Sequence, residues 1–253
     1  MSTRRHTLWN QTWGAAAALL GLAALTVATL GLAAVPGAAT DERQYLQAET
    51  CADATPAPHA SCLHARKARV ATVVIRDEPK QEEFTLRLHK TPGLPQEIDM
   101  GGEGPLLERL EAGDDVTVTL WRDYAVVVAR DGIAQETADT PEDEAESILA
   151  VALALIPLGT FLLHTGASAC ARARAWADTG LPAVLLLRLK WALGSTLCVL
   201  PAVALADLAD LGPVGEALVW CAMVPLVRHY LVWKAVRGQG RHARPLATES
   251  PVR

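Results

Sequence analysis

The chain has 253 residues, of which 51% are hydrophobic, and a formal net charge of −5. Its apolar residues are gathered in long Ala-, Leu- and Val-rich runs, which excludes a single globular core and indicates a membrane protein. Residues 36–146 hold 11 Lys and Arg against 23 Asp and Glu. This acidic segment is therefore excluded as a nucleic-acid-binding surface, since phosphate contacts need positive charge.

The first apolar run, residues 13–35, is long enough to cross a bilayer as a helix. Arg4 and Arg5 precede it, which places the N-terminus, residues 1–12, in the cytoplasm. The small residues before Ala39 also fit a signal-peptidase site. A secretory apolar region usually spans about 7–15 residues, so an uncleaved membrane anchor is favoured over a cleaved signal.

Residues 36–65 are predicted to form an extracytoplasmic stalk that contains Cys51 and Cys62. Disulfides persist outside the cytoplasm, so we expect these cysteines to be bridged, with two free thiols as the alternative. A metal site with the nearby His59 and His64 is disfavoured, because the paired cysteine spacing of structural zinc sites is missing. No metal is predicted.

Residues 66–137 alternate apolar and polar side chains, as expected for short strands. Tight turns are predicted at Arg122-Asp123 and at Asp131-Gly132, and a longer polar turn around Pro79. About five short strands indicate a small all-β antiparallel barrel or sandwich. In this pattern Trp121 is either an exposed contact residue for a partner or a core residue.

After an acidic linker at residues 138–146, three further apolar runs are predicted to cross the membrane. They are residues 147–167, 186–206 and 216–233, separated by a cytoplasmic loop at 168–185 and a short external loop at 207–215, and followed by a basic tail at 234–253.

The short loops set the orientation of these helices. Lys and Arg lie before the first helix, between the second and third, and after the fourth, while residues 207–215 have none. The prediction is therefore a four-helix, multi-pass protein of the cell membrane with both termini cytoplasmic. Arg172 and Arg174 either bind lipid headgroups or only fix this topology.

Four segments resemble a widespread bacterial domain of unknown function: "ARVATVVIRDE", "EEFTLRLHK", "LEAGDDVTVTLW" and "TADTPEDE". That resemblance implies an extracytoplasmic β unit between two membrane helices and covers about residues 66–163. The chain departs from the pattern because a Tyr-Asp-Pro sequence is missing after the "V-x-V" strand and two helices follow. The whole chain also resembles actinobacterial four-pass membrane proteins without an assigned activity, so the resemblance implies no catalytic residues.

No catalytic or cofactor-binding motif is recognised, and an enzyme is not expected. We expect a membrane protein whose acidic β domain binds a protein partner, senses a signal or organises the envelope. The alternative is a small transporter or channel subunit, since Pro157, Pro201 and Pro225 interrupt the last three predicted helices.

Overall fold

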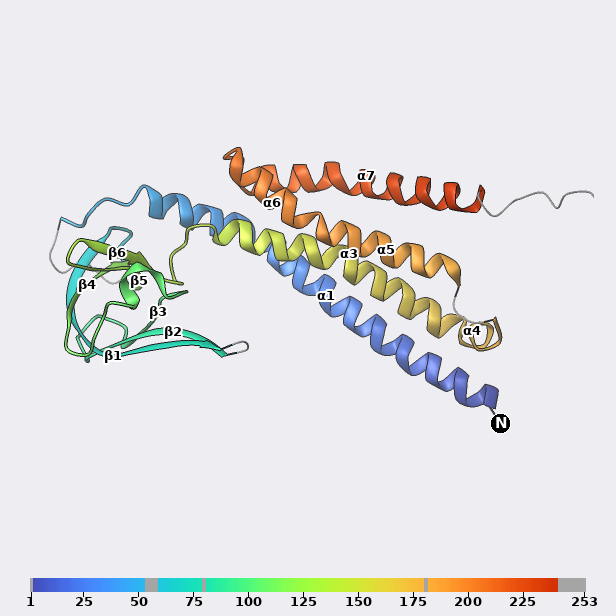
Figure 1. The fold of residues 1–253 in the computed structure, drawn as a ribbon, viewed down its shortest axis with the longest axis horizontal. Coiled ribbons are helices and arrows are strands. Elements are labelled where there is room, and N and C mark those ends of the chain that lie inside the picture. Colours follow the sequence, from blue (N-terminus) through green and yellow to red (C-terminus); the bar gives the residue numbers. More distant parts are fainter. Residues whose placement is uncertain (1, 53–58, 79–80, 180–181, 241–253) are drawn as a thin grey trace, which may run out of the picture. The chain divides into compact units, whose positions relative to one another are not determined.

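The computed structural model describes residues 2–52, 59–78, 81–179 and 182–240 (Figure 1). The chain divides into two units. Residues 1–35 and 146–253 form a helical unit, and residues 36–145 form a unit that contains the β strands.

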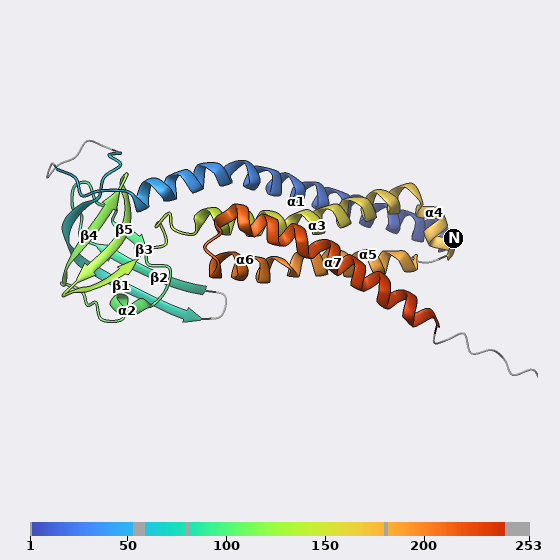
Figure 2. The ribbon, with the colours of Figure 1, turned by 90° about the horizontal axis from the view of Figure 1, so that it is seen from above.

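The helical unit is built mainly from long helices that run side by side in both views (Figures 1 and 2). The helices are α1 Ser2–Leu46, α3 Glu144–Ala171, α5 Ala183–Leu197, α6 Val199–Leu208 and α7 Gly212–Gly240, with the short α4 Ala173–Thr179 after α3. Among the described residues, three helical stretches are long and apolar enough to span a membrane: Gln11–Leu46, Glu144–Ala171 and Val184–Leu208. Membrane association is therefore supported by the structure.

Helix α7 is not among these three stretches. It is long enough, but Glu216, Arg228 and His229 interrupt its apolar sequence. A fourth membrane crossing over residues 216–233 therefore stays a prediction.

Helices α1 and α3 pack closely because small residues recur every seven positions on each of them. These residues are Gly14, Gly21 and Ala28 on α1, and Ala152, Gly159 and Gly166 on α3, all buried. A Cβ atom at Gly21 would lie 2.4 Å from the backbone nitrogen of Leu163. Small side chains allow such close approach, which is how helices associate in a membrane without a hydrophobic driving force.

The third predicted membrane helix is divided into α5 and α6, with the junction at Cys198. Pro201 explains the division, because it has no N–H to donate to the carbonyl of Leu197. The backbone bonds of Cys198 to Gly194 and of Ala202 to Cys198 remain, at 3.1 Å each.

Helix α1 ends at Leu46 rather than at the predicted Val35, so the beginning of the predicted stalk is helical. Pro36 lies inside the helix. Beyond it, polar residues of α1 contact the strands of the β unit: Asp41 forms an ion pair with Arg122 at 2.7 Å. These tertiary contacts hold a polar sequence in helical form, which an apolar-run criterion does not detect.

In the described part of the β unit, six strands form one antiparallel sheet of order β3-β2-β1-β4-β5-β6. The strands are β1 His64–Glu78, β2 Gln81–Leu88, β3 Glu97–Asp99, β4 Asp115–Trp121, β5 Tyr124–Arg130 and β6 Ile133–Glu136, with a short helix α2 at Gly104–Leu107. Both predicted tight turns are confirmed: Arg122 and Asp123 join β4 to β5 with φ of 49° and 72°, and Asp131-Gly132 joins β5 to β6. The tip of the predicted turn around Pro79 lies outside the described residues.

Strand β1 belongs to both halves of the sheet. Its first part, His64–Arg69, pairs with β4, and its second part, Val70–Glu78, pairs with β2. The core lies between these halves, with Val70, Leu86 and Val118 at 0% exposure, and Leu106 and Leu107 of α2 fill its centre.

The sheet is open, and the predicted barrel is not closed by a strand ladder. The edge strands β3 and β6 are too short to pair along their length. The buried Gln135 side chain bridges the gap instead: its Oε1 accepts from the backbone N–H of Leu106 and Leu107, and its Nε2 donates to the carbonyl of Gly102. Gly104 must lack a side chain, because a Cβ there would lie 2.2 Å from Gln135.

Candidate functional site

The structure contains the predicted disulfide between Cys51 and Cys62, whose Cα atoms are 5.1 Å apart. Backbone hydrogen bonds flank the bridge: Cys51 donates to Leu63, and Leu63 donates to Glu49, at 2.9 Å each. Residues 53–58 of the closed loop lie outside the described residues. Because both sulfurs are bonded to each other, neither is a free thiolate for a metal ion.

Trp121 is 2% exposed, so the structure places it in the core and not at the surface. Its ring contacts Tyr45 of α1 edge to face, with centroids 5.8 Å apart, and the Arg122 guanidinium lies 4.4 Å from its centroid. Of the two readings of the strand pattern, the core position is therefore the one observed. The alternation alone could not decide between them, because the residue that covers Trp121, Tyr45, belongs to a helix distant in the sequence.

Arg122 connects three parts of the β unit. Its guanidinium donates to Asp41 and to the Gln44 side chain in α1 and to the Ser61 hydroxyl near the disulfide. Asp123 beside it pairs with His59 at 2.8 Å. Arg122 thus fixes the end of α1 and the disulfide loop against the β4–β5 turn, which is a structural role.

A polar cleft of about 790 Å³ lies at this end of the β unit. Its lining includes four carboxylates: Asp41, Asp123, Asp139 and Glu144. Two of them are already paired, Asp41 with Arg122 and Asp123 with His59. Among the described residues that line the cleft, no nucleophile lies next to an activating base, so the cleft is assigned no chemistry.

The second exposed feature of the β unit is a two-stranded ribbon, which we call the arm and define as residues 72–78 of β1 and 81–84 of β2. It extends beyond the remaining strands in both views (Figures 1 and 2). β4 pairs with β1 only as far as Arg69, and β3 pairs with β2 only at Thr85–Arg87. Within the described residues, the arm therefore has no neighbouring strand along either outer edge, and only the Phe84 carbonyl at its base is bonded, by the backbone N–H of Met100 at 2.8 Å.

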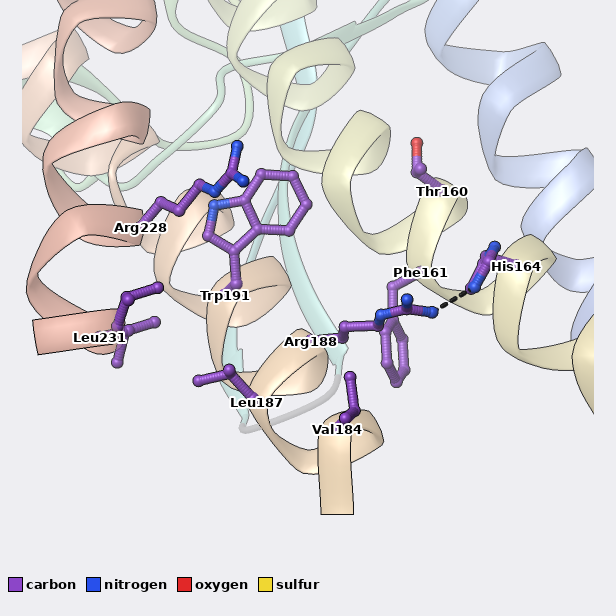
Figure 3. Close-up of a pocket in the computed structure, with 10 residues that line it drawn as sticks. Thr160, Phe161, His164, Val184, Leu187, Arg188, Trp191, Arg228 and Leu231 are labelled. Carbon is purple, nitrogen blue, oxygen red and sulfur yellow. Dashed lines mark hydrogen bonds between the residues drawn. The ribbon is translucent and has the colours of Figure 1, made fainter. Parts of the chain in front are cut away.

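The helical unit contains a cavity of about 430 Å³ between α3, α5 and α7 (Figure 3). Most of its wall is apolar: Phe161, Val184, Leu187, Trp191, Leu231 and Val232. Arg188 and Arg228 enter it from α5 and α7, and Arg188 donates a hydrogen bond to Nε2 of His164 on α3.

A smaller cavity of about 320 Å³ adjoins the first one and shares His164, Val184 and Arg188 with it. Its remaining lining includes Thr165, Ser168, Arg172 and Trp176. Arg172 and Arg174 were predicted either to bind lipid headgroups or only to fix the topology. Both are exposed; Arg172 lines this cavity, and Arg174 lines neither cavity.

Glu216, near the start of α7, is fully buried in the helical unit at 0% exposure. Among the described residues, neither of its carboxylate oxygens has a hydrogen-bond partner, nor has the hydroxyl of the buried Ser195. A buried carboxyl group without a partner costs much free energy when it is charged. Its position was missed from the sequence because Glu216 opens an apolar run and reads as an exposed helix end.

Comparisons with protein-family models, with curated proteins and with solved structures found no match. The resemblance to a bacterial domain of unknown function therefore stays a prediction. The features of the structure that bear on function are the arm, the cavities and the buried Glu216.

Proposed function

We propose that this chain is an integral membrane protein that presents its acidic β unit outside the cytoplasm to bind a protein partner. The proposed topology has four crossings and both termini in the cytoplasm. The crossings are residues 13–35, residues 147–167 and the last two apolar runs. This is the simplest topology that keeps every short basic segment on one side of the membrane. The disulfide supports the extracytoplasmic placement of the β unit, because such bridges are rare in reducing compartments.

The observation that carries this proposal is the unpaired arm. A strand with free N–H and C=O groups along its edge can accept an added strand from another chain. Ile75 is 40% exposed on the arm, whereas Phe84 opposite it is half-buried and packs against the core. The arm beyond Phe84 therefore offers backbone groups and the Ile75 side chain to a partner.

The charges of the arm define the kind of partner. The arm carries one arginine, Arg76, which pairs with Glu83 at 2.8 Å. Its acidic residues are Asp77, Glu78, Glu82 and Glu83. Edge charges of one sign keep two copies of the same strand from pairing. A segment with Lys or Arg next to apolar residues would complement the arm, whereas a second copy of this chain would be repelled.

Photo-crosslinking of the full-length protein in its native membrane tests this proposal. A benzoylphenylalanine at Ile75 should give a specific adduct, and the same probe at Tyr124, which is 57% exposed on the β4–β5 turn side, should not. Replacing Glu82 and Glu83 together with Lys should remove the adduct. Equal labelling from both probe positions, or an adduct that survives the charge reversal, would contradict it.

The buried Glu216 favours a second candidate function, a small transporter or channel subunit. Ionisable groups buried among membrane helices commonly mark ion or proton pathways. Glu146 on α3 lies near the start of α7, since a Cβ at Gly212 would be 3.8 Å from its Oε1. Reconstituted vesicles should then show an ion or proton flux that Glu216→Gln abolishes and Glu146→Gln alters. Vesicles without any flux above empty liposomes would exclude this candidate.

A further inference from the structure

The two adjoining cavities of the helical unit combine an apolar slot with a cationic end. The larger cavity is lined by Phe161, Leu187 and Leu231, which come from three different helices (Figure 3). The smaller cavity continues from His164 and Arg188 toward Arg172 and Trp176. A ligand that fills both must carry an apolar chain and an anionic group.

The arginines of this region lack anionic partners in the described part of the chain. No carboxylate there lies within 4.0 Å of Arg172, Arg188 or Arg228. The hydrogen bond from Arg188 to His164 Nε2 leaves the positive charge unbalanced. All three arginines are exposed, so their guanidinium groups are accessible to an anionic ligand, and an arginine is always charged.

Two more polar groups at these cavities have no partner among the described residues. They are the Thr165 hydroxyl and the Trp191 indole N–H. Thr165 lines the smaller cavity and Trp191 the larger one, but both of these polar atoms are themselves buried. The arginines are therefore the groups that can contact an anion.

We propose that this groove binds one anionic phospholipid. Its phosphate lies at Arg188, between Arg172 and Arg228, and an acyl chain lies along Phe161, Leu187 and Leu231. The proposed topology places Arg172 in the cytoplasmic loop and Arg188 and Arg228 near the cytoplasmic ends of their crossings. Anionic lipids concentrate at that face of the membrane. The site does not depend on the β unit or on its partner.

The apolar wall distinguishes a lipid from a free anion. Inorganic phosphate could satisfy the arginines but would leave the slot between α3, α5 and α7 unfilled. The volume of the slot is in the range of small-molecule sites, which bury most of an apolar ligand. Arg174 on α4 and Lys190 on α5 are exposed cations, and neither residue lines a cavity. They therefore provide matched controls.

Native mass spectrometry of the full-length protein with added phosphatidylglycerol or phosphatidylcholine tests the site. The protein should retain one phosphatidylglycerol in preference to phosphatidylcholine. Arg188→Gln with Arg228→Gln should weaken this binding roughly thirtyfold, since each arginine near a headgroup contributes about a factor of five. Arg174→Gln with Lys190→Gln removes the same formal charge and should leave it unchanged.

A third variant separates the groove from general surface charge. Leu187→Trp keeps all arginines but fills the slot, and it should weaken phosphatidylglycerol binding while helical circular dichroism stays that of the parent protein. Equal loss in the control double variant would show that only net charge matters. Unaltered binding in Leu187→Trp, or displacement of the lipid by inorganic phosphate at equal concentration, would overturn the proposal.

Discussion

Gly166 of α3 lies against the backbone of Ala18 in α1: a Cβ atom at Gly166 would be 2.4 Å from the Ala18 nitrogen and from the carbonyl oxygen of Gly14. No flexible side chain can move aside there, because the obstacles are backbone atoms. The two helices therefore remain in contact only while this position has no side chain.

We therefore expect Gly166→Ala to lower the stability of the full-length protein in detergent by about 1–3 kcal/mol, the range for overpacking a close contact. Gly37→Ala is the control, because a Cβ there meets nothing within 4 Å. It should leave the thermal midpoint unchanged or raise it. A Gly166→Ala midpoint equal to that of Gly37→Ala would disprove the close packing of α1 on α3.

Trp121 provides a test of the β-unit core. Trp121→Ala should destabilise the protein by about 3–5 kcal/mol, the usual cost of removing a buried aromatic side chain. Tyr124→Ala should have little effect, since Tyr124 is 57% exposed. Urea unfolding followed by circular dichroism of the full chain would measure both. A similar free-energy loss in the two variants would place Trp121 at the surface after all.

The disulfide gives a third prediction. Cys51→Ser should remove about 2–4 kcal/mol of stability in the chain-entropy account of loop closure. The β unit should still fold in this variant, because the sheet core is formed by residues of β1 to β5 and α2. Alkylation of unreduced protein should leave Cys51 and Cys62 unlabelled, and labelling of both would argue against the bridge.

The sequence predicts well those features that depend on residues close together in the chain. Period-two alternation and the Arg122-Asp123 turn located β4 and β5, and two cysteines in a short polar loop located the disulfide. The three-residue strand β3 was missed because three residues carry no periodicity. The open edge of the sheet was missed because it depends on the Gln135 side chain, a contact between residues far apart in the chain.

In the helical unit, too, the sequence predicts local features but not distant contacts. The apolar runs located the helices, but they did not show which faces of the helices pack together. The seven-residue spacing of Gly14, Gly21 and Ala28 is visible in the sequence and could have predicted the contact with α3. The convergence of Arg188 and Arg228 on one cavity could not be predicted, since it depends on how α5 and α7 pack.

The number of membrane crossings decides between the proposed topology and a three-helix arrangement. Helix α7 is the element in question, because its apolar sequence is interrupted by Glu216 and Arg228. Alkaline phosphatase and fluorescent-protein fusions report on opposite sides of the membrane. If α7 crosses, fusions after Arg174 and Val236 should both read cytoplasmic, and fusions after Lys90 and Asp210 external. If α7 lies along the membrane surface, the fusion after Val236 should read external while the other three are unchanged. A cytoplasmic reading at Lys90 would contradict both arrangements and the extracytoplasmic placement of the β unit.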